Sequence, residues 1–78
     1  GQRGEREVDL IVERDDQRFV AIEVKSAQAV SDDDGKHLRR LQEQAGDAML
    51  DAIIVSTGPL AYRRKDGIGV VPLGLLGE

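Results

Sequence analysis

The chain has 78 residues, a formal net charge of −4 and no cysteine, which allows one globular domain and excludes disulfides, thiolate zinc sites and a cysteine nucleophile. One histidine excludes a histidine-rich metal site, and no apolar run reaches the ~18 residues of a membrane helix. With no signal peptide either, we expect a cytoplasmic protein that makes no membrane contact. The negative net charge disfavours a protein that coats DNA, because such a domain would be basic overall. It does not exclude a nuclease, because catalytic carboxylates add negative charge to the metal-free protein.

Two strands are predicted first, joined by a tight turn. Residues 1–6 form a polar lead-in, and apolar residues then alternate with charged ones over Glu7–Glu13, which is typical of a strand with one apolar face. A turn over Arg14–Arg18 leads to a second strand, Phe19–Lys25, which is rich in β-branched residues. The two strands are expected to form an antiparallel hairpin.

One helix is predicted after this hairpin. Ser31 or Asp32 is expected to cap its N-terminus, and Gly46 is expected to end it. Its apolar stripe consists of Leu38, Leu41 and Ala45. A helix between two strands makes a right-handed crossover, so the strands on either side of it should be parallel.

The remaining segments complete a small sheet. Ala52–Ser56 is almost wholly apolar, as in a central strand that is buried on both faces. Ala61–Arg63 and Ile68–Pro72 flank an Asp-Gly turn and predict a final hairpin, and Leu73–Glu78 begins a terminal helix. The order β-β-α-β-β predicts an α/β domain with a small mixed β-sheet and one crossover helix.

Acidic residues on the first hairpin are the candidate chemistry. Because strand pairing preserves faces, Asp9 must share a face with Glu23 and Lys25. One register, in which Arg14 pairs with Arg18, puts Asp9 opposite Glu23; the next allowed register puts it opposite Lys25. Directly opposed Cβ atoms lie about 4.5–5.5 Å apart. Two carboxylates that close suit a Mg²⁺ ion, and a neighbouring ammonium can offset transition-state charge. The alternative is that Glu-x-Lys is ordinary solvent-facing strand sequence.

The order and spacing of these segments resemble the PD-(D/E)XK nuclease superfamily. The half-motif is Asp9, thirteen intervening residues and then Glu23-Val24-Lys25. The likeness is closest to the nuclease-like C-terminal domain of unknown function of prokaryotic AAA-type ATPases, where Glu-Val-Asp, (Ile/Val)-Glu-Val-Lys, Thr-Gly and Pro-Leu recur in this order. It covers about Glu7 to Leu76. The resemblance implies a restriction-endonuclease-like core and metal-dependent hydrolysis of DNA phosphodiesters.

The resemblance also assigns roles to individual residues. Asp9 and Glu23 would be metal ligands for Mg²⁺ or Mn²⁺, and Lys25 would be the catalytic lysine. No G-x-x-x-x-G-K-[ST] stretch is present, so we expect no ATP site in these residues. A start at Gly1 rather than Met indicates a piece of a longer protein or a vector-derived start, and the resemblance implies that a longer parent would be an ATPase. Separately, basic residues on the helix and the final hairpin are candidate contacts to DNA phosphates: Arg39, Arg40, Arg63, Arg64 and Lys65.

Two other interpretations stay open. The domain could be a catalytically inactive module that binds nucleic acid or protein for an attached or partner ATPase, or a purely structural or dimerising end domain. We expect a homodimer, because a core this small leaves apolar surface uncovered, above all along residues 68–76. His37, Gln44 and Tyr62 are secondary candidates for substrate contacts, although residues so placed more often edge a core.

Overall fold

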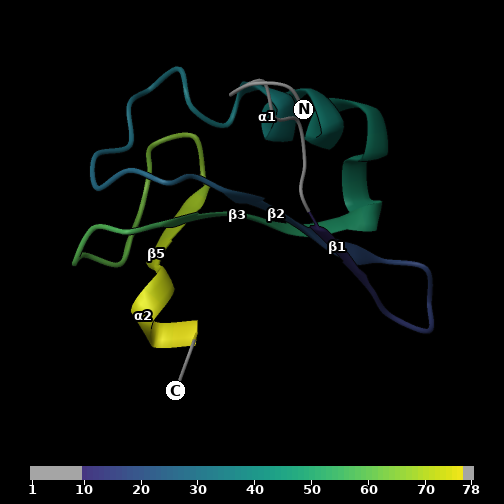
Figure 1. Cartoon of the computed structure of the whole chain (residues 1–78). Helices are drawn as coiled ribbons and strands as arrows, with labels where there is room; N and C mark the ends of the chain where they lie inside the picture. Colours follow the sequence, from purple (N-terminus) through teal and green to yellow (C-terminus); the bar gives the residue numbers. More distant parts are fainter. Residues whose placement is uncertain (1–9, 77–78) are drawn as a thin grey trace.

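A mixed five-stranded sheet with one helix packed on it forms the body of the computed structural model, which describes residues 10–76 (Figure 1). The strand order is β1-β2-β3-β5-β4. In chain order the elements are β1 (Leu10–Glu13), β2 (Phe19–Val24), α1 (Lys36–Ala45), a 3-10 turn η1 (Gly46–Ala48), β3 (Met49–Ser56), β4 (Tyr62–Arg63), β5 (Gly69–Pro72) and α2 (Leu73–Leu76).

The pairing of the strands confirms the predicted mixed sheet. β1 pairs antiparallel with β2, and β4 pairs antiparallel with β5. β2 is parallel to β3, as the crossover through α1 requires, and β3 is parallel to β5. β3 is the central strand and is mostly buried, as its apolar sequence predicted, although it begins at Met49 rather than Ala52. The chain is therefore a small mixed α/β domain.

The register of the first hairpin is the one that closes on Arg14 and Arg18. The amide of Arg14 donates to the carbonyl of Arg18 at 2.7 Å, and the ladder continues to Leu10 opposite Ile22. The predicted strand Glu7–Glu13 extends beyond this point, but residues 7–9 lie outside the described residues. Of the predicted hairpin, the structure therefore describes the part from Leu10 onwards.

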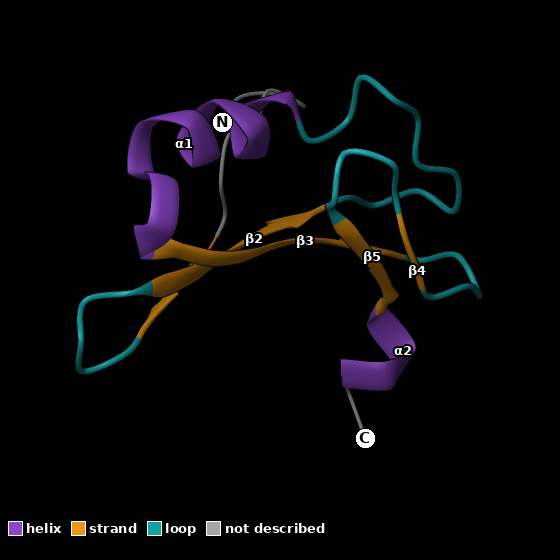
Figure 2. Ribbon diagram, turned by 180° about the vertical axis from the view of Figure 1, so that it is seen from behind, coloured by secondary structure: helices purple, strands orange, loops and turns teal. Residues whose placement is uncertain are grey.

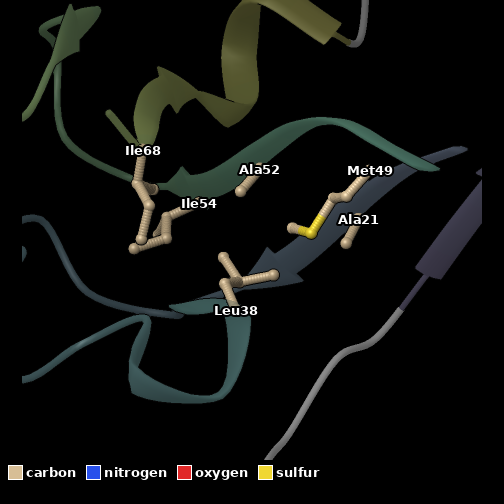
Figure 3. Packing of buried hydrophobic residues seen from close by; sticks show 6 residues of the cluster. All are labelled: Ala21, Leu38, Met49, Ala52, Ile54 and Ile68. Atoms are coloured by element: carbon tan, nitrogen blue, oxygen red, sulfur yellow. The ribbon is translucent and has the colours of Figure 1, made fainter. Parts of the chain in front are cut away.

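The core lies between the sheet and α1. Small side chains on the sheet, such as Ala21 and Ala52, let Leu38 of α1 approach the strands closely, and Leu38 is fully buried (Figure 3). Leu41 and Ala45 pack against the same cluster, which confirms the predicted apolar stripe. The buried members of the cluster are Ala21, Leu38, Met49, Ala52, Ile54 and Ile68.

The predicted start of the helix is wrong. Helix α1 begins at Lys36, after turns over residues 32–35, and no side chain caps it. Gly35 precedes it in the left-handed region at φ 89°, and it is buried where a Cβ would lie 3.0 Å from Ile68 Cδ1. The side chain of Asp34 is bonded to Lys25 and Ser31, which draws residues 31–34 out of the helix. Gly46 ends α1 as predicted.

The second face of the sheet is much less covered. Figure 2 shows α1 on one side of the sheet and α2 on the other. Leu10, Val12 and Val24, which point away from α1, are 53%, 50% and 46% exposed. The expectation that residues 68–76 form the uncovered stretch is wrong in its first half, because Ile68 and the strand β5 are largely buried in the sheet and core. In its second half, Leu73 and Leu75 of α2 are exposed.

Candidate functional site

The carboxyl ends of the three parallel strands meet at one edge of the sheet. In open α/β sheets this is the edge at which ligands bind. β2 ends there at Val24, and β3 ends there at Ser56. Because β1 runs antiparallel to β2, it starts at this edge. No membrane-spanning helix is found among residues 10–76.

Two predicted site residues lie together at this edge. Glu23 pairs with Ile54 of β3 and shares the face of Ala21, which is the face that α1 covers. Lys25 follows two residues later on the same face, and its amide extends the ladder by donating to the carbonyl of Val55 at 2.8 Å. The third predicted residue, Asp9, lies outside the described residues.

Lys25 forms an ion pair that the sequence did not predict. Its Nζ lies 2.9 Å from Oδ1 and 2.8 Å from Oδ2 of Asp34. The same carboxylate accepts from the amide and the hydroxyl of Ser31 at 2.8 and 3.1 Å. Partial burial by itself raises the pKa of Asp34, but the hydrogen bonds from Lys25 and Ser31 and the charge of Lys25 outweigh it and lower that pKa. Asp34 is therefore an anion at neutral pH.

A signal for Asp34 was present in the sequence. A serine three residues before an aspartate, followed by glycine, favours a closed turn in which the two side chains bond to each other and to the backbone. We expected a helix cap because the same residue types occur there. The partner that decides between the two, Lys25, lies nine residues earlier in the chain.

Arg64 holds the 31–35 loop from the opposite side. Its guanidinium donates to three backbone carbonyls, those of Ser31, Asp32 and Asp34, at 3.2, 3.1 and 2.8 Å. Its side chain is only 10% exposed. Arg64 was a candidate contact for DNA phosphates; in the structure it fixes the loop that carries Asp34.

The other basic candidates divide into two groups. Arg39 pairs with Asp66 at 3.0 Å, and Arg63 pairs with Asp51 at 2.7 Å. Arg40 and Lys65 form no ion pair with any residue between 10 and 76. A cavity of about 430 Å³ is lined by residues of both signs, Asp32, Arg39, Arg64, Lys65 and Asp66, and neither Glu23 nor Lys25 lines it.

The connection after β3 packs tightly beside the site. The amide of Thr57 donates to the carbonyl of Ala27 at 3.0 Å, which ties the end of β3 to the segment that follows Lys25. A Cβ on Gly58 would lie 2.4 Å from the carbonyl oxygen of Gln28, so only glycine fits there. This explains physically why a glycine follows Thr57 after the third strand.

A family model matches residues 1–76 and is described as a domain of unknown function, DUF4143. The chain belongs to the DUF4143 family. No curated protein and no solved structure matches it. Within the described part of this DUF4143 domain, no group of three or more histidine or acidic side chains is arranged to hold a metal ion.

Proposed function

We propose that this DUF4143 domain is a PD-(D/E)XK-type phosphodiesterase domain with a restriction-endonuclease-like core, which hydrolyses DNA with the help of a divalent metal ion. The register of β1 and β2 carries the proposal. The described register has Leu10 opposite Ile22, which agrees with the predicted register that pairs Asp9 with Glu23. Lys25 follows on the face of Glu23, at the edge where ligands of α/β sheets bind.

The donor chemistry fits Mg²⁺ or Mn²⁺. Mg²⁺ sites typically use one or two carboxylates together with water and substrate phosphate, and Asp9 and Glu23 would supply two carboxylates. When bound, the ion would act as a Lewis acid on the phosphate and favour deprotonation of a water. The two carboxylates on one face would repel each other, and a bound cation would relieve this repulsion.

Lys25 would stabilise the negative charge that develops on the phosphate. Its ammonium is paired with the carboxylate of Asp34, so it serves as a cation and hydrogen-bond donor rather than as a base. Its place two residues after Glu23 puts it beside the proposed ligands.

A hydrolysis assay tests this function. Wild-type protein is expected to cleave DNA in the presence of Mg²⁺ or Mn²⁺ and to lose this activity in EDTA. Glu23→Gln should abolish cleavage, and Lys25→Gln should lower kcat by about 10²-fold or more. Glu43→Gln, which changes an exposed carboxylate of α1, is the matched control and should leave kcat unchanged. Cleavage that survives Glu23→Gln would contradict the proposal.

Few of the five basic candidates would contact DNA phosphates. Arg39, Arg63 and Arg64 are held by internal partners, which leaves Arg40 and Lys65 among the five candidates. Each true phosphate contact adds about 0.9 to the magnitude of the slope of log K against log salt. Arg40→Ala and Lys65→Ala should each lower that magnitude by about 1, whereas Arg63→Ala should leave it unchanged.

A second function is favoured by the exposed apolar face of the sheet. Leu10, Val12 and Val24 are about half exposed, and contiguous apolar patches of this kind commonly mark protein interaction sites. In this alternative the domain is an inactive module that binds an attached or partner ATPase, or a second copy of itself. Absence of metal binding and of cleavage in the wild type would favour it.

A further inference from the structure

The carboxylate of Asp34 is bonded within its own loop as well as to Lys25. Oδ2 accepts from both the amide and the hydroxyl of Ser31, which closes a turn over residues 31–34. Lys25 Nζ lies 2.9 Å from Oδ1 and 2.8 Å from Oδ2 of the same carboxylate. The carboxylate is thus held from two sides, by Ser31 of its own loop and by Lys25 after β2.

The loop is itself anchored to the rest of the fold. Arg64 binds three of its carbonyls, and Gly35 at its end is buried where a Cβ would lie 3.1 Å from Ile54 Cδ1 and 3.0 Å from Ile68 Cδ1. Arg64 is fixed in turn by Asp66 at 2.7 Å. A continuous set of hydrogen bonds therefore runs from the β4–β5 turn through the loop to Asp34.

We propose that Asp34 is a positioning residue for Lys25, which holds the ammonium in place for a phosphate oxygen beside Glu23. This inference rests on the function proposed above. A lysine side chain has four rotatable bonds, and a free one would have to be ordered during the reaction. An ammonium has three N–H donors, and the two oxygens of Asp34 can engage two of them, so at least one donor stays available to substrate. Supporting groups of this kind keep a reactive side chain in its productive geometry.

Two substitutions of Asp34 separate the effect of its side-chain shape from the effect of its charge. Asp34→Asn keeps the shape and removes the charge, and it should lower kcat for DNA cleavage by tenfold or more while KM stays within about twofold. Asp34→Glu keeps the charge and should recover part of the loss. Asp16→Asn removes an exposed carboxylate that pairs with Arg14, and it is the matched control with unchanged kcat. A kcat for Asp34→Asn within twofold of wild type, or above it, would overturn the inference.

A second readout does not depend on cleavage. In NMR spectra of the side-chain ammonium groups, Lys25 should give a protected signal in the wild type, unlike the exposed Lys36 and Lys65. Asp34→Asn should remove this protection. If the wild type cleaves no DNA, the proposed function fails, and the Lys25 ammonium signal alone tests the role of Asp34. Loss of its protection in Asp34→Asn supports positioning by Asp34, and persistence of the protection overturns it. If Asp34→Asn does not fold, Ser31→Ala is measured in the same way and should weaken the protection.

Discussion

Arg64 and Asp66 lie in the same β4–β5 turn, and Nη2 of Arg64 donates to Oδ2 of Asp66 at 2.7 Å. Arg39 of α1 reaches the same oxygen at 3.0 Å, and the other oxygen accepts from the amide of Ile68. One carboxylate therefore joins the helix to the last hairpin. It also keeps Arg64 in the orientation that holds the 31–35 loop.

This arrangement predicts a loss of stability in acid. Burial acts on Asp66 most strongly and alone would raise its pKa, but the bonds from Ile68, Arg64 and Arg39 together lower it. The pKa of Asp34 is lowered as well. A lowered pKa in the folded state gives stability that is complete above the unfolded pKa of about 3.9 and is lost as the pH falls through the folded value. Urea unfolding should show constant stability from about pH 6 to 5 and a decline below about pH 4.

The contribution of Asp66 can be isolated. Asp66→Asn should cost about 1–2 kcal/mol at pH 7, because it removes charge-assisted hydrogen bonds from two arginines. It should also flatten the decline below pH 4. Asp33→Asn is the control, because it changes an exposed side chain that forms no ion pair with residues 10–76. It should neither lower the stability at pH 7 nor flatten the decline below pH 4. An unchanged decline in Asp66→Asn would show that other carboxylates are responsible.

The glycine after β3 gives a second prediction. Gly58→Ala should destabilise the domain by about 1–3 kcal/mol, because the new Cβ would lie 2.4 Å from the backbone oxygen of Gln28 and one segment must shift. Gly74→Ala in α2 is the control, since its Cβ meets nothing within 4 Å and alanine favours a helix. Thermal unfolding of both variants measures the difference. Equal melting temperatures would mean that the connection after Lys25 adapts without cost.

The apolar face predicts self-association. Val12 and Ile11 are neighbours in the edge strand β1, and both are about half exposed. Val12 lies on the sheet face away from α1, whereas Ile11 lies on the face of Ala21, which α1 covers. If the uncovered face joins two copies, Val12→Lys should weaken the dimer by tenfold or more in analytical ultracentrifugation. Ile11→Lys should change it little. A wild-type protein that stays monomeric across a wide concentration range would argue against this homodimer.

Local patterns were sufficient for much of the fold. The three-residue turn between Arg14 and Arg18 gives one of the two hairpin registers that the sequence allows, and it is the one observed. The spacing of Leu38 and Leu41 identifies the helix face that meets the sheet. The unbroken apolar run before Ser56 identifies the central strand. Each of these features depends on residues that are close in sequence, where periodicity is informative.

The remaining features depend on contacts between distant residues. Whether residues 31–34 begin a helix or form a loop depends on the bond between Asp34 and the distant Lys25, and Gly35 precedes α1 at a positive φ beside Ile54 and Ile68. The role of Arg64 is decided by carbonyls more than 29 residues away. Which sheet face is covered also could not be predicted, because the more apolar face of β1 is the one that α1 leaves exposed. The site residue that sequence reasoning missed, Asp34, belongs to this class.

The central claim is that Asp9 and Glu23 together bind a divalent cation, and a thermal titration with Mn²⁺ tests it most directly. A ligand at about 100 times its Kd stabilises a folded protein by about 2.7 kcal/mol, which is roughly 10 °C or more for a domain of this size. We predict such a rise for the wild type and for Glu43→Gln, and none for Glu23→Gln or Asp9→Asn. Without metal, these two variants should be as stable as the wild type or more so, because one of two crowded carboxylates is gone. A wild type that Mn²⁺ does not stabilise, or a rise that persists in Glu23→Gln, would contradict the claim.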